Sequence, residues 1–248
     1  MIPIYVLWMR QLKRYVRSRP RVIGSLGQPL LFLLALGFGL GPVFRKAGQG
    51  SYLQFLASGI VGMAVLFTAM FSGIELIWDR QFGFLKETLV APVPRIQIMI
   101  GRTLGGATVA VLQGLVVIII AVVAGFRVTH YAGLASALVF MGLIGLTFTA
   151  LGTALASVLP DFQGFQLIMN LLVMPIFFLS GALFPLIGLP KLLDVIARLD
   201  PLSYGVDGLR TALTGVGHFG LGTDLAVLSG LCAVLLVLGG WLFSRIEL

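Results

Sequence analysis

The chain has 248 residues, of which 58% are hydrophobic and only 10% are charged, and its formal net charge is +8. Soluble globular proteins average roughly 25% charged residues because water must hydrate their surface. This composition excludes an ordinary soluble domain and predicts an integral membrane protein. Nucleic acid is not expected as a partner, because the basic residues flank apolar segments and form no separate face for a duplex.

Residues 1–20 predict an amphipathic helix in the membrane interface, closed by Pro20. Apolar and aromatic residues recur at helical spacing, and basic residues crowd the opposite side. The first set is Ile4, Leu7, Trp8, Leu12 and Tyr15, and the second is Arg10, Lys13, Arg14 and Arg17. Trp8 and Tyr15 are expected to lie at the level of the lipid headgroups.

Six apolar segments follow, each close to the ~20 residues that a helix needs to cross the hydrocarbon core. The expected spans are residues 22–42, 52–77, 103–126, 134–159, 165–186 and 225–243. We therefore expect an all-α integral membrane protein with six transmembrane helices in a single domain, 1–248. Residues 187–223 are apolar but interrupted by prolines and glycines, so they are expected to enter the outer leaflet as short re-entrant helices.

Lysine and arginine residues are distributed unevenly between the two sides. With the N-terminus inside, eleven of them fall in cytoplasmic segments and six in outside loops. Cytoplasmic loops carry an excess of Lys and Arg, so both termini are expected in the cytoplasm. These residues are also expected to contact anionic membrane lipid. The short loops favour a prokaryotic inner membrane, that is, the plasma membrane.

The cytoplasmic loop 78–102 predicts a short amphipathic helix over residues 82–90. Phe82, Leu85 and Leu89 can share one face, with Lys86 opposite. A short helix held parallel to the membrane would suit a cytoplasmic partner that pushes on it. An ordinary interfacial helix would show the same pattern, so this alternative stays open.

A second informative stretch follows the fifth span. Ser180 and Gly181 permit a close approach of helices or a break. Asp200 precedes a proline and is expected to cap the next helix. Asp207 and Arg210 are three residues apart on that helix and can pair. A capped surface turn with a weak ion pair would account for the same residues.

In this order, the two stretches resemble the membrane subunit of type-2 ATP-binding-cassette exporters, which include daunorubicin-resistance-like permeases and polysaccharide exporters. The first loop of that family has an arginine–glycine–leucine segment, then a proline and a basic residue, which correspond here to Arg80, Gly83, Leu85, Pro92 and Arg95. Its late signature corresponds to Ser180, Gly181, Phe184, Pro185, Asp200, Pro201, Tyr204 and Arg210. The resemblance covers nearly the whole chain, although each motif alone is degenerate.

The resemblance implies a homodimer, or a heterodimer with a similar chain, on two separate ATPase subunits. The loop helix, with Lys86 and Glu87, would be the coupling helix that the ATPases push. The segment from Asp200 to Arg210 would belong to the extracellular helices that close the exit. The sequence contains no Gly-x-x-x-x-Gly-Lys-Ser/Thr segment, so ATP and Mg²⁺ are expected on the partner and no cofactor on this chain. The chain is thus expected to be a transport subunit and not an enzyme.

Few other polar residues suggest chemistry, and no catalytic or metal site is expected. His130 and His218 are not spaced as metal ligands. Gln113 and Asn170 are candidates to line a path, although hydrogen bonds between helices are their commoner role. Glu75 is expected to pair with Arg80 or to reach the interface. We expect an exporter permease for an amphiphilic, lipid-linked or drug-like cargo, with an ion-coupled carrier dependent on Glu75 or a non-transporting scaffold as alternatives.

Overall fold

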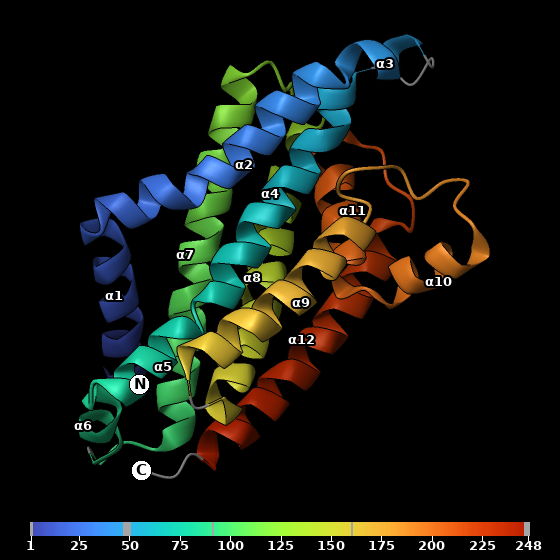
Figure 1. The fold of residues 1–248 in the computed structure, drawn as a ribbon. Coiled ribbons are helices and arrows are strands. Elements are labelled where there is room, and N and C mark those ends of the chain that lie inside the picture. The colour runs from blue at the N-terminus through green and yellow to red at the C-terminus, as the bar shows by residue number, and fades with distance from the viewer. Residues whose placement is uncertain (1, 47–50, 91, 160, 246–248) are drawn as a thin grey trace.

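The computed structural model describes residues 2–46, 51–90, 92–159 and 161–245, and helix is the only regular secondary structure of these residues (Figure 1). In chain order the helices are α1 (Ile2–Arg17), α2 (Arg19–Gly39), α3 (Gly41–Lys46), α4 (Tyr52–Phe71), α5 (Ile74–Gln81), α6 (Phe84–Val90), α7 (Arg95–Val123), η1 (Tyr131–Gly133), α8 (Leu134–Val158), α9 (Phe162–Leu179), α10 (Lys191–Leu199), α11 (Pro201–Thr214) and α12 (Leu221–Ser244). The expected all-α class is confirmed.

Six helical segments of the described chain are long and apolar enough to cross a membrane, which confirms the expected number of spans. They are Val22–Gly39, Tyr52–Gln81, Arg95–Val123, Tyr131–Val158, Phe162–Leu179 and Leu221–Ser244. Since apolar length decides whether a helix can span the hydrocarbon core, these elements were the easiest to predict.

Three expected spans differ in detail from those observed. The second span, Tyr52–Gln81, contains a break, because α4 ends at Phe71 and α5 begins at Ile74. The third was expected to begin at residue 103, but α7 begins at Arg95. The fifth span was expected to reach residue 186, but α9 ends at Leu179. Gly181 adopts a φ of 70°, a left-handed conformation that a right-handed helix cannot continue through.

Helix α4 forms the centre of the bundle, and most of its span is buried. It packs against α2, α7, α8 and α11. Small residues let these helices approach closely: a Cβ atom on Gly152 of α8 would meet the Met70 backbone of α4, and one on Gly62 of α4 would lie 2.8 Å from Val206 of α11. Helices α2 and α9 are peripheral and leave much of their surface exposed.

The predicted N-terminal helix is present as α1 and lies along the first half of α7 (Figure 1). The two helices run in the same direction, since Gly101 of α7 lies against Ile4, and Thr108 of α7 accepts a hydrogen bond of 3.0 Å from the indole Nε1 of Trp8. The apolar face of α1 thus covers α7, another helix of the same chain. At its last turn α1 meets α2 at a sharp corner.

One end of the bundle, which we call the base, holds α5, α6, the first turns of α1 and α7, and the last turns of α8 and α12. Helix α6 begins at Phe84, two residues later than predicted, because Gly83 has a φ of 80° and separates it from α5. Phe82 lies before that break and is exposed, so it does not share the buried face of Leu85 as expected. The side chain of Leu89 lies outside the described part of the structure.

The expected helices between the last two spans are α10 and α11. The last turn of α11 lies at the end of the bundle opposite the base, where Ala212 contacts Gly133. Its first turns lie deeper, because Gly205 packs against Ile144 of α8. The segment therefore enters the bundle from one end and returns to that end.

Candidate functional site

Helix α6 is held at the base by one buried side chain. Leu85 is 1% exposed, whereas Phe84, Glu87 and Val90 are exposed. The outer face of α6 is therefore open in this chain. The side chain of Lys86 lies outside the described part of the structure. The turn after α6 exposes Pro92.

Arg80 fixes α5 to the end of α8. Its guanidinium donates hydrogen bonds of 3.1 Å to the carbonyl oxygens of Leu159 and Ser157, and one of 3.4 Å to that of Ala156. The last carbonyls of a helix have no partner within the helix and carry partial negative charge, so a guanidinium is a favourable cap. The expected pairing of Arg80 with Glu75 was wrong, because this capping role holds the side chain. Arg95 is exposed and joins the start of α7 to the end of α12 through a bond of 2.6 Å to the Ser244 carbonyl.

Two acidic residues of α5 face arginines from two other helices. Asp79 pairs with the buried Arg102 of α7 and lies 3.3 Å from Arg10 of α1. Glu75 lies 3.4 Å from Arg14, one turn further along α1. The two acids are 2% and 4% exposed. We call these five residues the base charge cluster. Sequence reasoning missed its pairing, because the partners lie on separate helices.

The turn after α9 lies in the half of the bundle opposite the base, and polar groups anchor it there. The hydroxyl of Ser180 donates to the Phe177 carbonyl at 2.8 Å and accepts from the Ala182 amide at 3.3 Å. Arg210 donates to the carbonyl oxygen of Gly181 at 2.9 Å. The structure thus brings together Ser180, Gly181 and Arg210, which the sequence pattern had joined only by order.

The other residues of the late family motif lie near the turn after α9. Phe184 and Pro185 are partly buried in the turn after Ala182. The Tyr204 hydroxyl donates to the Arg198 carbonyl at 2.8 Å, which ties α11 to α10, and its ring stacks on Phe219.

Asp200 caps α11 as predicted, with Oδ1 accepting from the Leu202 amide at 2.9 Å, and Pro201 occupies the first helical position. Its Oδ2 is buried without a hydrogen-bond partner among the described residues. Burial raises the pKa of Asp200 to about 7, although the bond from Leu202 opposes this shift. A buried carboxyl favours its neutral form because the low-dielectric surroundings do not solvate the charge.

The expected pair of Asp207 and Arg210 is not formed. Asp207 accepts hydrogen bonds of 2.8 Å from the amides of His218 and Phe219, which fold the turn after α11 back onto that helix. Burial lowers the pKa of Arg210 to about 10, which leaves it charged at neutral pH. Asp224, at the start of α12, is fully buried, and neither carboxylate oxygen has a hydrogen-bond partner among the described residues. Sequence reasoning did not single it out.

The two amides proposed to line a path differ in position. Gln113 is fully buried and accepts a hydrogen bond from the Tyr15 hydroxyl, so it joins α7 to α1. Asn170 is exposed on α9, on the same face as Leu167, Leu171 and Met174. Its side chain makes no hydrogen bond among the described residues.

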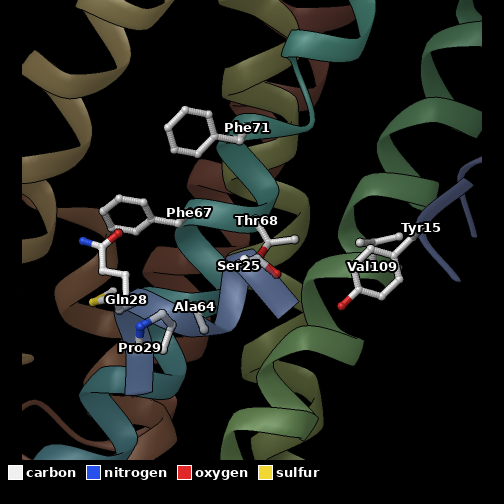
Figure 2. Close-up of a pocket in the computed structure, with 11 residues that line it drawn as sticks. Tyr15, Ser25, Gln28, Pro29, Ala64, Phe67, Thr68, Phe71 and Val109 are labelled. Atoms are coloured by element: carbon white, nitrogen blue, oxygen red, sulfur yellow. The ribbon is translucent and has the colours of Figure 1, made fainter. Parts of the chain in front are cut away.

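A cavity of about 380 Å³ lies between the first turns of α2 and the second half of α4 (Figure 2). Figure 2 shows the ring of Phe67 of α4 beside Gln28 of α2, Phe71 further along α4, and Tyr15 and Val109 beyond Ser25 and Thr68. Its complete lining is Tyr15, Gly24, Ser25, Gln28, Pro29, Met63, Ala64, Phe67, Thr68, Phe71 and Val109. Apolar and aromatic walls with a few polar groups are typical of sites for small amphiphilic molecules. Sequence reasoning missed this cavity, because its wall is assembled from four helices.

The six candidate spans and the short helices between them define a polytopic α-helical membrane protein. The profile described as ABC-2 type transporter matches residues 3–214. The chain therefore belongs to the ABC-2 type transporter permease family, which indicates a transport subunit. Permeases of this family generally work with ATP-binding subunits.

Named relatives agree with this family. Nodulation protein J of Rhizobium leguminosarum bv. trifolii is 34% identical over 213 residues, which cover 85% of this chain and 78% of the relative. Nodulation protein J of Rhizobium meliloti is 30% identical over 204 residues, with 81% and 77% covered. The protein named "Putative transport permease ycf38" of Cyanophora paradoxa is 29% identical over 214 residues, with 84% and 72% covered.

Proposed function

We propose that this chain is the permease subunit of an exporter that separate ATP-binding subunits drive through α6. The observation that carries the proposal is the arrangement of α5 and α6 at the base. Leu85 packs inward, Glu87 and Pro92 are exposed, and Arg80 fixes the preceding helix to α8. A force on α6 would therefore reach the spans directly, as a coupling helix requires.

The base would face the cytoplasm, with both termini on that side. Basic residues concentrate in the N-terminal segment and in the segment 78–102, namely Arg10, Lys13, Arg14, Arg17, Arg80, Arg95 and Arg102. Cytoplasmic segments of membrane proteins carry this excess, and anionic lipid attracts it. The membrane would be a prokaryotic inner membrane. The turn after α9 and helices α10 and α11 would then close the outer exit, with Arg210 holding the turn to α11.

A second copy of the chain, or a similar chain, would cover the exposed faces of α2 and α9. Asn170 supports this arrangement, because an amide exposed to lipid tails loses its hydrogen bonds to water. Leu167 and Leu171, on the same face, are 71% and 78% exposed in the single chain. Asn170 would then lie at the interface of the two copies, beside the path.

The cavity beside α2 and α4 supports an amphiphilic, lipid-linked or drug-like cargo. Phe67 and Phe71 would contact an apolar portion, and Gln28 and Thr68 offer hydrogen bonds to a polar portion. ATP and Mg²⁺ would bind to the partner subunits.

Export by proteoliposomes that contain this chain and its ATP-binding partner would test the proposal. Gly83→Ala places a Cβ at a φ of 80°, which strains the link before α6, so export per ATP hydrolysed should fall about tenfold. Gly220→Ala is the matched control, because Gly220 also has a positive φ, 98°, and no atom within 4 Å of the added Cβ, but it precedes α12, outside the base and outside the segment assigned to the exit. Equal export by the two variants would remove α6 from the coupling role.

The same assay separates the alternatives. Transport that needs an ion gradient and no ATP would indicate an ion-coupled carrier. No vectorial transport with any partner would indicate a scaffold.

A further inference from the structure

The base charge cluster joins α1, α5 and α7 along the length of α5, the helix that precedes α6. Asp79 contacts Arg102 of α7 and Arg10 of α1, and Glu75 contacts Arg14 of α1. A second contact, of 3.8 Å, links Arg14 to Asp79. Arg10 and Arg14 are one turn apart, as are Glu75 and Asp79, so the long arginine side chains of α1 reach acids on two successive turns of α5. Movement of α5 relative to α1 would have to separate these charges.

Packing alone does not require charges here. The side chains of Arg102 and Asp79 are 6% and 3% exposed, and a buried ion pair is often no more stable than apolar residues of similar volume. Ionisable residues within membrane spans carry a large free-energy cost and usually have a functional role. Helix α1 already holds α7 by other contacts, through Ile4 at Gly101 and Gln11 at Gly105. The acids of α5 therefore add a specific link between α5 and α1.

Helix α1 ends at the cavity. Tyr15 follows Arg14 directly, lines the cavity and donates its hydroxyl hydrogen bond to Gln113. Ser18 alone separates α1 from α2, and Gly24, Ser25 and Gln28 of α2 form another part of the wall. A shift of α1 would thus move two parts of the cavity wall together.

We propose that Asp79 and Glu75 are positioning residues that transmit the displacement of α6 through Arg10 and Arg14 of α1 to the cavity wall at Tyr15 and Ser25. This inference rests on the proposed function, and it adds α1 as the moving part between the coupling helix and the cargo cavity. Arg102 holds Asp79 to α7, so the base of α7 moves with the same unit.

The test measures access to the cavity in the complete transporter with its ATP-binding subunits. Cys232 is the single cysteine and is replaced by serine, and Ser25→Cys then introduces one thiol at the cavity wall. The rate at which a maleimide labels this thiol is compared with and without ATP. We expect ATP to change the rate severalfold in the parent, and Asp79→Asn or Glu75→Gln to abolish that change.

Export and ATP hydrolysis are measured in the same preparations. In Asp79→Asn and Glu75→Gln, we expect hydrolysis within about twofold of the parent and export about tenfold lower, because the partner still docks on α6. The conservative variant Glu75→Asp should restore part of the export. Asp161→Asn is the matched control: it removes a carboxylate charge outside the cluster, asparagine can still accept the capping hydrogen bond from the Gly164 amide, and all three readouts should be unchanged.

The inference fails if ATP still changes the labelling of Ser25→Cys in both charge-removing variants. It also fails if hydrolysis and export fall together, because that result indicates loss of structure or of partner binding. Glu75→Gln keeps the test decisive if Asp79→Asn does not insert, since it leaves the pair of Asp79 and Arg102 intact. Failure of the proposed function would look different, because the parent itself would show no ATP-driven export.

Discussion

The guanidinium of Arg210 lies over the ring of Phe55, with Cζ 4.0 Å from the ring centroid. The same guanidinium donates to the Gly181 carbonyl, so one side chain of α11 contacts both α4 and the turn after α9. Cation–π contacts contribute about 0.5–2 kcal/mol, and more of this is retained where water is excluded. The turn, α11 and α4 are therefore held by a single charged group.

Loss of this group should loosen the turn without unfolding the bundle. We expect Arg210→Gln to lower stability by about 1–3 kcal/mol, because the Gly181 carbonyl loses a charged donor and the ring loses its cation. Phe55→Leu, which removes only the ring contact, should cost less. Thermal unfolding in detergent measures both. Equal stability of Arg210→Gln and the parent would contradict an anchoring role.

Gly59 of α4, one turn after Phe55, contacts the same turn at Ala182. An added Cβ would meet the backbone of Ala182, which cannot move as the end of a flexible side chain can. Gly59→Ala should therefore destabilise the protein by about 1–3 kcal/mol, which is typical of overpacking. In Gly222→Ala of α12 the new methyl group meets nothing within 4 Å, so this control should be neutral or slightly stabilising. Thermal unfolding that ranks the two variants in the reverse order would rule out this close contact.

Asp200 should make stability depend on pH. Its pKa of about 7 exceeds the ordinary value of 3.8, so the folded protein holds the proton more tightly than the unfolded chain does. The contribution of Asp200 to the free energy of unfolding is fully present below about pH 4. As pH rises from about 4 to 7, this contribution falls by up to about 1.4 kcal/mol per pH unit. Asp200→Asn keeps an oxygen for the cap but cannot ionise, so its unfolding temperature should vary less over this range. A parallel pH profile for the two proteins would contradict this assignment.

Local sequence patterns predicted the elements and their caps. The six spans follow from apolar length, and the cap at Asp200 follows from its place before Pro201. Contacts between distant residues could not be predicted in this way. Arg102 looked like one basic residue among several near the base, but it pairs with Asp79, 23 positions earlier. Arg80 was matched with nearby Glu75, whereas the fold brings it to the end of α8.

Arg80 caps the end of α8, and substitutions at this position can test that role. Arg80→Ala leaves the carbonyls of Ala156, Ser157 and Leu159 without their donor. Hydrogen bonds to charged groups contribute about 1.5–3 kcal/mol, so we expect a loss of that size and a marked fall in export per ATP hydrolysed. Arg80→Lys keeps the charge but not the planar fork that reaches several carbonyls at once, so it should restore only part of both quantities. Full restoration by lysine would show that charge at the base is sufficient, and that the fixed link between α5 and α8 is not required for coupling.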